Sequence, residues 1–208
     1  EEAIDRAYAR FATQKIPSGI KAIKPNELDT IFYKPIDLSA YDKVHVIGDI
    51  HGCHTALMEF MNNYDVNAND FFIFLGDYLD RGLENVQTLE YLLDLWENHK
   101  NVYFLEGNPE AHLRNWANGE DIMSPEFRNH TMPKLEQAGI DKKRVRQFCR
   151  SFGQCSYFTF HGMNVLVTHG GLSTMPKNLT FIATEQMIKG VGDYKDANIV
   201  DGAFYTST

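Results

Sequence analysis

The feature that most constrains the fold is a repeated unit in which an apolar run ends in glycine and a polar residue. The runs are KVHVIGD, FFIFLGD and VYFLEGN, at residues 43–49, 71–77 and 102–108. Amphipathic helical patterns over residues 53–63 and 83–99 separate them. The units therefore follow one another about every 30 residues, as parallel βαβ units do. Their near-continuous apolar character predicts a sheet covered on both faces.

The second half of the chain has a different pattern. Residues 109–152 are polar with helical character, and breaks are expected at Gly119, Pro125, Pro133 and Gly139. Residues 155–171, CSYFTFHGMNVLVTHGG, predict a hairpin that turns around residues 161–164. A parallel half followed by an antiparallel half predicts an α/β fold with a mixed sheet or two packed sheets. A further helix is expected at residues 184–189.

Composition fits one domain with a sizeable core. The chain has 208 residues, of which 43% are hydrophobic, and a formal net charge of −8. An acidic chain argues against a broad nucleic-acid-binding face, which would be basic. Three cysteines favour a reducing compartment over a disulfide scaffold, so we expect a cytoplasmic protein. No apolar run approaches the ~20 residues of a membrane span, so no membrane partner is expected.

The N-terminal part precedes the first strand of the repeat. Residues 1–13 predict a short amphipathic helix, and residues 14–43, with three prolines, predict a connecting arm. Residues 44–208 are expected to form the main domain. Because the chain begins with EEAIDRAYARF and lacks an initiator methionine, we expect it to be a fragment or processed product of a longer protein.

Polar side chains follow the three predicted strands where each strand ends. Asp49, Asp77 and Asn108 occupy these positions, and ligands of open α/β sheets bind outside the carboxyl ends of strands. His51 lies two residues after Asp49, and His169 ends a fourth strand. Taken singly, each residue is more simply a turn, cap or loop residue. Their joint placement at strand ends is what predicts a shared site.

Carboxylate, imidazole and carboxamide groups together suit manganese, iron or zinc. Two carboxylates among five ligands suggest two ions about 3.5–4 Å apart that share one carboxylate, an arrangement used for phosphoryl chemistry. A bridging water would then become hydroxide and attack phosphorus. The segment GDYLDRG adds Arg81, a clamp for phosphate oxygens, and Asp80, a candidate to orient a catalytic imidazole.

The segment YFLEGNPEAHLRN, at residues 103–115, also predicts the start of a helix. Asn108 is predicted to be the N-cap, Pro109 the first helical residue and Glu110 an acid in the positive first turn. Both capping and metal binding would place the Asn108 side chain at the carboxyl end of the strand.

The motifs GDIHG, GDYLDRG, GNPE and THGG, in this order and spacing over residues 44–172, resemble those of the calcineurin-like metallophosphoesterases, in particular the phosphoprotein-phosphatase branch. The resemblance implies a two-sheet β-sandwich flanked by helices. It also implies two divalent ions, manganese first, with iron, zinc or nickel as alternatives. Asp49 and His51 would hold one ion, Asp77 would bridge, and Asn108 and His169 would hold the second. Arg81 and Asn108 would contact the substrate.

This resemblance implies a phosphoric ester hydrolase acting on phosphate monoesters in proteins, nucleotides or RNA ends. Residues 1–23 and the segment leading to GDIHGC also resemble the junction between kinase and phosphatase in bacterial and phage polynucleotide kinase–phosphatases. A kinase domain is then expected upstream. The chain has no G-x-x-x-x-G-K-[ST] motif, so it carries no kinase activity itself.

Two departures from the family pattern bear on activity. Pro109 stands where the family has a histidine that protonates the leaving group and is held by the carboxylate matching Asp80. No histidine follows His169, so the second metal site and the C-terminal part of the domain are expected to be incomplete. We therefore expect reduced hydrolysis. The alternatives are a catalytically degenerate metal-binding or interaction module of the same fold and, third, an α/β domain without metal.

Overall fold

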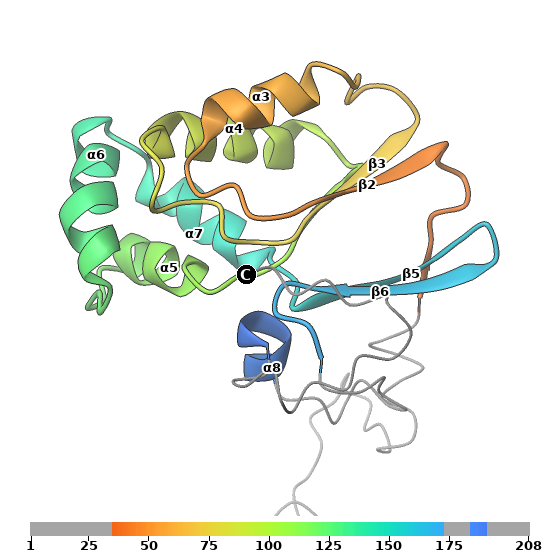
Figure 1. Cartoon of the computed structure of the whole chain (residues 1–208). Helices are drawn as coiled ribbons and strands as arrows, with labels where there is room; N and C mark the ends of the chain where they lie inside the picture. The colour runs from red at the N-terminus through yellow and green to blue at the C-terminus, as the bar shows by residue number, and fades with distance from the viewer. Residues whose placement is uncertain (1–34, 173–183, 191–208) are drawn as a thin grey trace, which may run out of the picture. The chain divides into compact units, whose positions relative to one another are not determined.

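A computed structural model describes residues 35–172 and 184–190 of the chain. Its strands form two three-stranded sheets (Figure 1). The first is parallel, in the order β2-β3-β4, and consists of β2 (Lys43–Ile47), β3 (Asp70–Phe74) and β4 (Val102–Phe104). The second has the order β1-β5-β6 and consists of β1 (Ile36–Asp37), β5 (Cys155–Phe160) and β6 (Met163–Thr168). β1 is parallel to β5, and β6 is antiparallel to it.

The two sheets pack against each other. Of the two arrangements that the sequence predicted, a mixed sheet or two packed sheets, the structure has two packed sheets. Along β3, Phe72 and Phe74 belong to the core beneath the helices, whereas Ile73 between them packs with Leu38 and Phe158 of the second sheet region. This alternation follows from the two-residue period of a strand. Both faces of the parallel sheet are therefore covered, as its apolar strands predicted.

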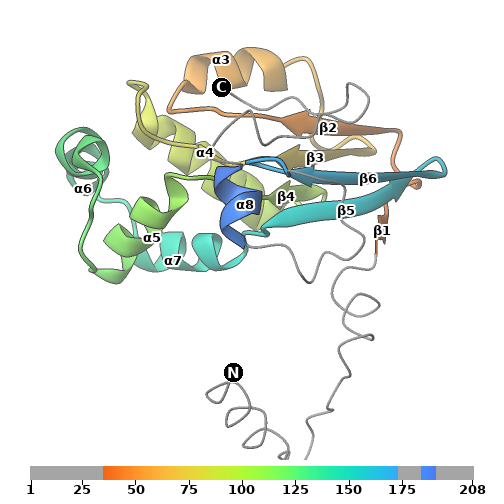
Figure 2. The same cartoon turned by 60° about the horizontal axis from the view of Figure 1, so that its bottom comes forward.

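Helices cover the outer face of the parallel sheet and one end of the fold. α3 (His54–Met61) and α4 (Asn85–Asn98) lie over the sheet, as Figures 1 and 2 show. A second group follows β4 and is made of α5 (Glu110–Asn118), the π-helical turn η2 (Phe127–Thr131), α6 (Met132–Gln137) and α7 (Lys142–Arg150). The expected C-terminal helix is present as α8 (Thr184–Lys189).

Three of the four predicted breaks are confirmed and one is wrong. Pro125 is the first helical residue after the loop at residues 120–124. Gly119 and Gly139 adopt positive φ angles of 77° and 69° after α5 and α6. Pro133, in contrast, lies in the first turn of α6 instead of separating two helices. The preceding π turn shifts the hydrogen-bonding register, so the missing N–H of the proline is accommodated.

The predicted hairpin is confirmed. β5 and β6 pair from Cys155–Thr168 to Phe160–Met163, which leaves a two-residue turn. His161 and Gly162 in that turn both have positive φ, at 47° and 81°, the geometry that matches the twist of hairpin strands.

The chain is thus an α/β protein of two packed sheets flanked by helices. The helix expected at residues 1–13 lies outside the described residues, and within the expected arm Ile36 and Asp37 pair with β5 as β1. A search of the described helices finds none with the length and apolarity needed to cross a membrane.

Candidate metal centre

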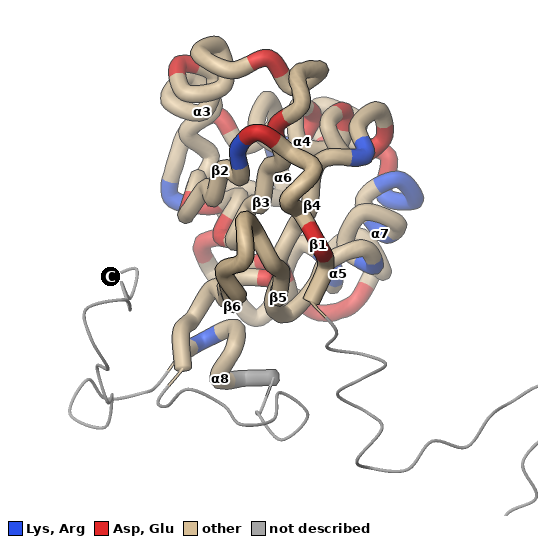
Figure 3. Tube along the Cα trace, turned by 90° about the vertical axis from the view of Figure 1, so that its right-hand side faces the viewer, with Lys and Arg blue, Asp and Glu red and all other residues tan. Residues whose placement is uncertain are grey.

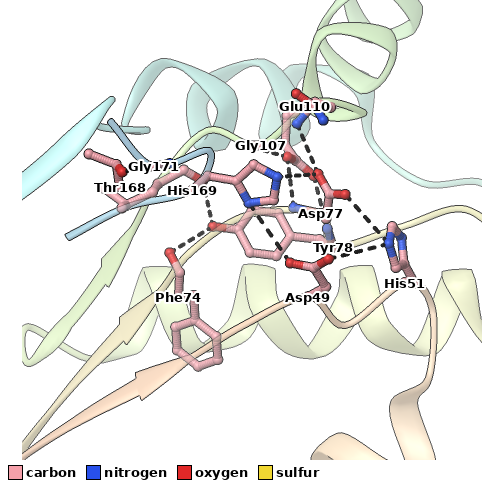
Figure 4. Close-up of polar contacts among 12 residues, drawn as sticks. Asp49, His51, Phe74, Asp77, Tyr78, Gly107, Glu110, Thr168, His169 and Gly171 are labelled. Atoms are coloured by element: carbon pink, nitrogen blue, oxygen red, sulfur yellow. Dashed lines mark hydrogen bonds and ion pairs between the residues drawn. The ribbon is translucent and has the colours of Figure 1, made fainter. Parts of the chain in front are cut away.

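Four of the five predicted ligands have side chains that meet at one point. Asp49 follows β2, Asp77 follows β3 and His169 follows β6, and one ligand atom from each lies within 4.8 Å of the others. His51 joins them, with Nε2 3.7 Å from Asp49 Oδ2 and 3.4 Å from Asp77 Oδ2. Figure 4 shows the four side chains pointing toward one another. The convergence expected from the strand ends is therefore present.

The His51 imidazole has its ligand nitrogen facing the carboxylates. Its Nδ1 lies 3.2 Å from the carbonyl oxygen of Leu79, which only accepts hydrogen bonds, so Nδ1 carries the proton. Nε2 is the other ring nitrogen, and this atom is buried without a hydrogen-bond partner among the described residues. A divalent cation beside the carboxylates would satisfy it.

His169 lies between the same two carboxylates. Its Nε2 is 3.1 Å from Asp77 Oδ1 and its Nδ1 is 3.9 Å from Asp49 Oδ1. Burial lowers the pKa of His169, but the hydrogen bond to Asp77 and the charges of Asp77 and Asp49 outweigh it, so the pKa lies above its usual value. The cluster therefore favours positive charge. Nδ1 of His169 is a second buried nitrogen without a partner in the described part of the chain, so the residues present fit a metal site.

The backbone at this site is locally strained. Among the described residues, five that are not glycine have positive φ, and four of them lie in the two Gly-Asp motifs: His51 (48°), Asp77 (54°), Asp80 (71°) and Arg81 (64°). Such conformations persist where the surrounding structure enforces them, and they gather at functional sites.

Backbone hydrogen bonds between the two motifs enforce this conformation. The N–H of His51 donates to the carbonyl of Asp77 at 2.8 Å, and the N–H of Gly52 donates to Tyr78 at 2.8 Å. In return, the N–H of Gly82 donates to the carbonyl of His51 at 2.8 Å. The loops after β2 and β3 are thus joined by their main chains, and His51 is held against Asp77.

Asp80 and Arg81, which follow Asp77 in the loop after β3, have different environments. Asp80 is buried, its N–H donates to Asn85 Oδ1 at 3.0 Å, and its carboxylate accepts a short hydrogen bond from the Thr131 hydroxyl. Burial raises the pKa of Asp80, and the bond from Thr131 partly opposes the rise. The carboxylate expected to orient an imidazole is thus held here by a hydroxyl from η2. Arg81 is exposed to solvent.

Asn108 reaches the cluster through its main chain. Its N–H donates to Asp77 Oδ1 at 2.9 Å, while the residue is exposed. The expectation that Asn108 caps the following helix is wrong, because Pro109 occupies the N-cap position and α5 has no side-chain cap hydrogen bond. The physical reason is that Pro109 already has helical backbone angles (φ −73°, ψ −19°) and its carbonyl accepts the N–H of His112 at 2.9 Å, so the helical turn starts one residue later than a cap at Asn108 requires.

Glu110 is a site residue whose role sequence reasoning missed. Its side chain is fully buried and accepts three backbone hydrogen bonds, from Gly107, Asp77 and Tyr78. Burial raises the pKa of Glu110 to about 7. Its position in the first turn of a helix was visible, but two of its three partners, Tyr78 and Asp77, come from another loop, 32 and 33 residues away in sequence.

The fold and the site together define a class of protein: a two-sheet α/β domain with an oxygen- and nitrogen-rich metal site at the strand ends. Residues 42–202 match the calcineurin-like phosphoesterases, and the chain belongs to this family. The family uses a dinuclear divalent metal centre.

Curated relatives are phosphatases of two kinds. The chain is 26% identical to an asymmetrical bis(5'-nucleosyl)-tetraphosphatase PrpE from Oceanobacillus iheyensis, over 62% of this chain and 56% of the relative. It is 29% identical to the serine/threonine-protein phosphatase 6 catalytic subunit of Caenorhabditis elegans, over 62% of this chain and 36% of the relative. A symmetrical tetraphosphatase from a Marinomonas species is 27% identical over 78% and 55% of the two chains. The chain thus spans about half the length, or less, of these relatives.

Solved structures include a Saccharomyces cerevisiae protein serine/threonine phosphatase with a TM-score of 0.41 and 21% identity, covering 71% of this chain and 46% of that one.

Proposed function

We propose that the chain is a metal-dependent phosphatase that hydrolyses phosphate monoesters. One observation carries the proposal: Asp49, His51, Asp77 and His169 meet at the strand ends with two buried imidazole nitrogens lacking hydrogen-bond partners in the described structure. Two carboxylates this close repel each other unless positive charge lies between them.

The residues would have the following roles in metal binding. Asp49 and His51 would hold one cation, Asp77 would bridge, and His169 would hold the second together with the exposed carboxamide of Asn108. When bound, two divalent cations lower the pKa of water and stabilise charge on phosphoryl oxygens. Manganese is our first choice, with iron, zinc or nickel as alternatives, because the donors are carboxylate oxygens and imidazole nitrogens.

Arg81 is proposed to bind the substrate phosphate. It is exposed and directly follows Asp80, and both residues have positive φ angles, 71° at Asp80 and 64° at Arg81. A guanidinium offers parallel N–H donors to two phosphate oxygens and stays charged at all relevant pH values. Asn108 is proposed to contact the same phosphate.

The substrate class is drawn from the relatives and from the resemblance of the N-terminal segment. A phosphoprotein, a nucleotide or the phosphate at an RNA end would each present the same monoester. An RNA-end substrate and a kinase domain fused upstream are proposed from the similarity of residues 1–23 to kinase–phosphatase junctions. A cytoplasmic location is proposed from the small number of cysteines.

A second candidate is a metal-binding or interaction module with little catalysis. Pro109 favours it, because proline has no proton to donate to a leaving group. Under the first candidate the same residue predicts reduced activity on poor leaving groups.

The test is hydrolysis of p-nitrophenyl phosphate by the 208-residue chain with and without Mn²⁺. We expect activity that requires Mn²⁺ and falls at least about 100-fold in Asp77→Asn, because that side chain contacts both histidines. Asp121→Asn, which changes an exposed aspartate in the loop after α5, should leave activity unchanged. Mn²⁺ binding without hydrolysis would favour the second candidate, and activity that survives both chelation and Asp77→Asn would contradict the proposed site.

A further inference from the structure

A single carboxyl group joins the two loops that carry Asp77 and Asn108. Glu110 Oε2 accepts the N–H of Gly107 at 2.7 Å and of Asp77 at 3.0 Å, and Oε1 accepts the N–H of Tyr78 at 2.9 Å. Figure 4 shows Glu110 beside Asp77, on α5. Both oxygens are used, and the residue is 1% exposed.

The two loops are in contact at this place, with no room for another side chain. A Cβ added to Gly76 would lie 2.4 Å from the backbone nitrogen of Gly107, and one added to Gly107 would lie 2.5 Å from Asp77 Oδ1. Buried N–H groups need acceptors, and an unpaired one costs about 1–3 kcal/mol. Glu110 supplies the acceptors for three of them at once.

The Asp77 carboxylate is thereby fixed from two directions. Its own backbone N–H is bound by Glu110, and its Oδ1 accepts the N–H of Asn108 from the other loop. The orientation of Asp77 relative to Asn108 therefore depends on the carboxyl group of Glu110, which touches neither the histidines nor Asp49 in the described contacts.

We propose that Glu110 is a positioning residue of the metal centre, which sets Asp77 and Asn108 at the spacing that two cations need. This inference rests on the proposed function, since it assumes that Asp77 and Asn108 bind cations. It predicts that changes at Glu110 weaken cation binding even where the chain stays folded. Mutation of a residue that orients metal ligands typically lowers metal affinity about 10–100-fold.

The variant Glu110→Gln tests this by exchanging one acceptor for a donor. An amide keeps the shape of the side chain, but its NH₂ group faces an N–H wherever it is placed, so at least one bond is lost. Glu110→Asp keeps the charge and shortens the reach by one methylene. The matched control is Glu106→Gln, in the same loop, whose carboxylate binds Arg114 at 2.6 Å instead of the backbone.

Mn²⁺ affinity is measured by calorimetry on the 208-residue chain and each variant, with circular dichroism to confirm folding. We expect Glu110→Gln and Glu110→Asp to bind Mn²⁺ about 10–100-fold more weakly, and Glu106→Gln to bind like the unmodified chain. Unchanged Mn²⁺ affinity in folded Glu110 variants would overturn the positioning role while leaving the proposed function intact. Failure of the unmodified chain to bind Mn²⁺ would overturn both.

A second measurement needs no variant, so it holds even if the substitutions prevent folding. If Glu110 couples the loops to the site, cation binding must in turn stabilise its hydrogen bonds. Zn²⁺, which is diamagnetic, should slow amide hydrogen exchange of Asp77, Tyr78 and Gly107 by at least about tenfold relative to Ala138 in the turn after α6. Equal effects of Zn²⁺ on all four amides would contradict the inference.

Discussion

Asp77 combines a chemical role with a structural one. Its carboxylate lies beside His51 and His169, its carbonyl accepts the N–H of His51, and its N–H donates to Glu110. The sequence predicted the first role, because a polar residue at a strand end is visible in the pattern. It did not predict the other contacts, because they depend on how closely the loops approach one another.

Thr131 is predicted to stabilise the buried carboxylate of Asp80. Thr131→Val removes the hydroxyl that donates to Asp80, so we expect a loss of about 1–3 kcal/mol in the free energy of unfolding and a further rise in the pKa of Asp80. Urea denaturation at neutral pH measures the loss.

Thr88→Val is the matched control for this substitution. Thr88 is as fully buried as Thr131, but its Oγ1 has no hydrogen-bond partner among the described residues, so the change should be neutral or stabilising. Equal destabilisation by the two substitutions would show that the bond to Asp80 contributes nothing specific.

Pro109 is predicted to limit the leaving groups that the chain accepts. Pro109→His supplies a proton donor, and general acid catalysis typically contributes about 10²–10⁴-fold. We expect hydrolysis of glycerol phosphate to rise at least about tenfold, with a much smaller rise for p-nitrophenyl phosphate, whose leaving group needs little protonation.

Pro109→Ala controls for the loss of the proline ring and should not raise the rate. If Pro109→His leaves the rate on glycerol phosphate unchanged, the proposed lack of an acid is wrong, or water or His112 already supplies the proton.

At the scale of elements, the glycines before the strand-end ligands differ in importance. Gly107→Ala would place a methyl group 2.5 Å from Asp77 Oδ1 and 2.7 Å from Glu110 Oε2, whereas a Cβ on Gly48 meets nothing within 4 Å. We expect Gly107→Ala to lower Mn²⁺ affinity at least about tenfold and to reduce stability, and Gly48→Ala to change neither. Calorimetry and thermal denaturation of both variants measure these effects, and normal Mn²⁺ binding by Gly107→Ala would contradict the close approach of the loops.

The sequence predicted elements well where the signal is local. The strands that precede Asp49, Asp77 and Asn108, the hairpin and the helix at 184–189 all follow from periodicity and turn residues. The turn, expected at residues 161–164, is confined to residues 161–162, because Met163 and Asn164 pair within β6. Prediction from the sequence failed at Pro133, where a π turn accommodates the proline, and at Asn108, where Pro109 occupies the N-cap position without a side-chain cap hydrogen bond. Both exceptions arise from contacts or registers that a local pattern does not encode.

At the scale of the whole molecule, the net negative charge is not distributed evenly over the elements, and α7 is basic. The chain has a net charge of −8, yet five of the nine residues of α7 are lysine or arginine, which Figure 3 shows in blue. Three of them are already engaged, Arg144 with Glu97, Lys142 with Glu136 and Arg146 with the carbonyl of Ala117. Two of the five positive charges of α7 are therefore paired with carboxylates, and Arg146 is held by a neutral carbonyl oxygen.

The sequence reduced the possible arrangements to a mixed sheet or two packed sheets, but it did not decide between them. Apolar strands predicted cover on both faces, and the hairpin supplied the second sheet, but pairing β1 with β5 joins residues 122 positions apart. Such long-range contacts leave no periodic signal. The same limit applies to the candidate metal centre: the strand-end positions of Asp49, Asp77 and His169 were predictable, whereas the contacts of Glu110, Thr131 and Asn85 were not.

The most direct test of the metal centre is anomalous X-ray diffraction from crystals of the 208-residue chain grown with Mn²⁺. We predict two anomalous peaks about 3.5–4 Å apart with the Asp77 carboxylate between them, one beside Asp49 and His51 and the other beside Asn108 and His169. A single peak away from Asp77, or no peak at the strand ends, would contradict this prediction.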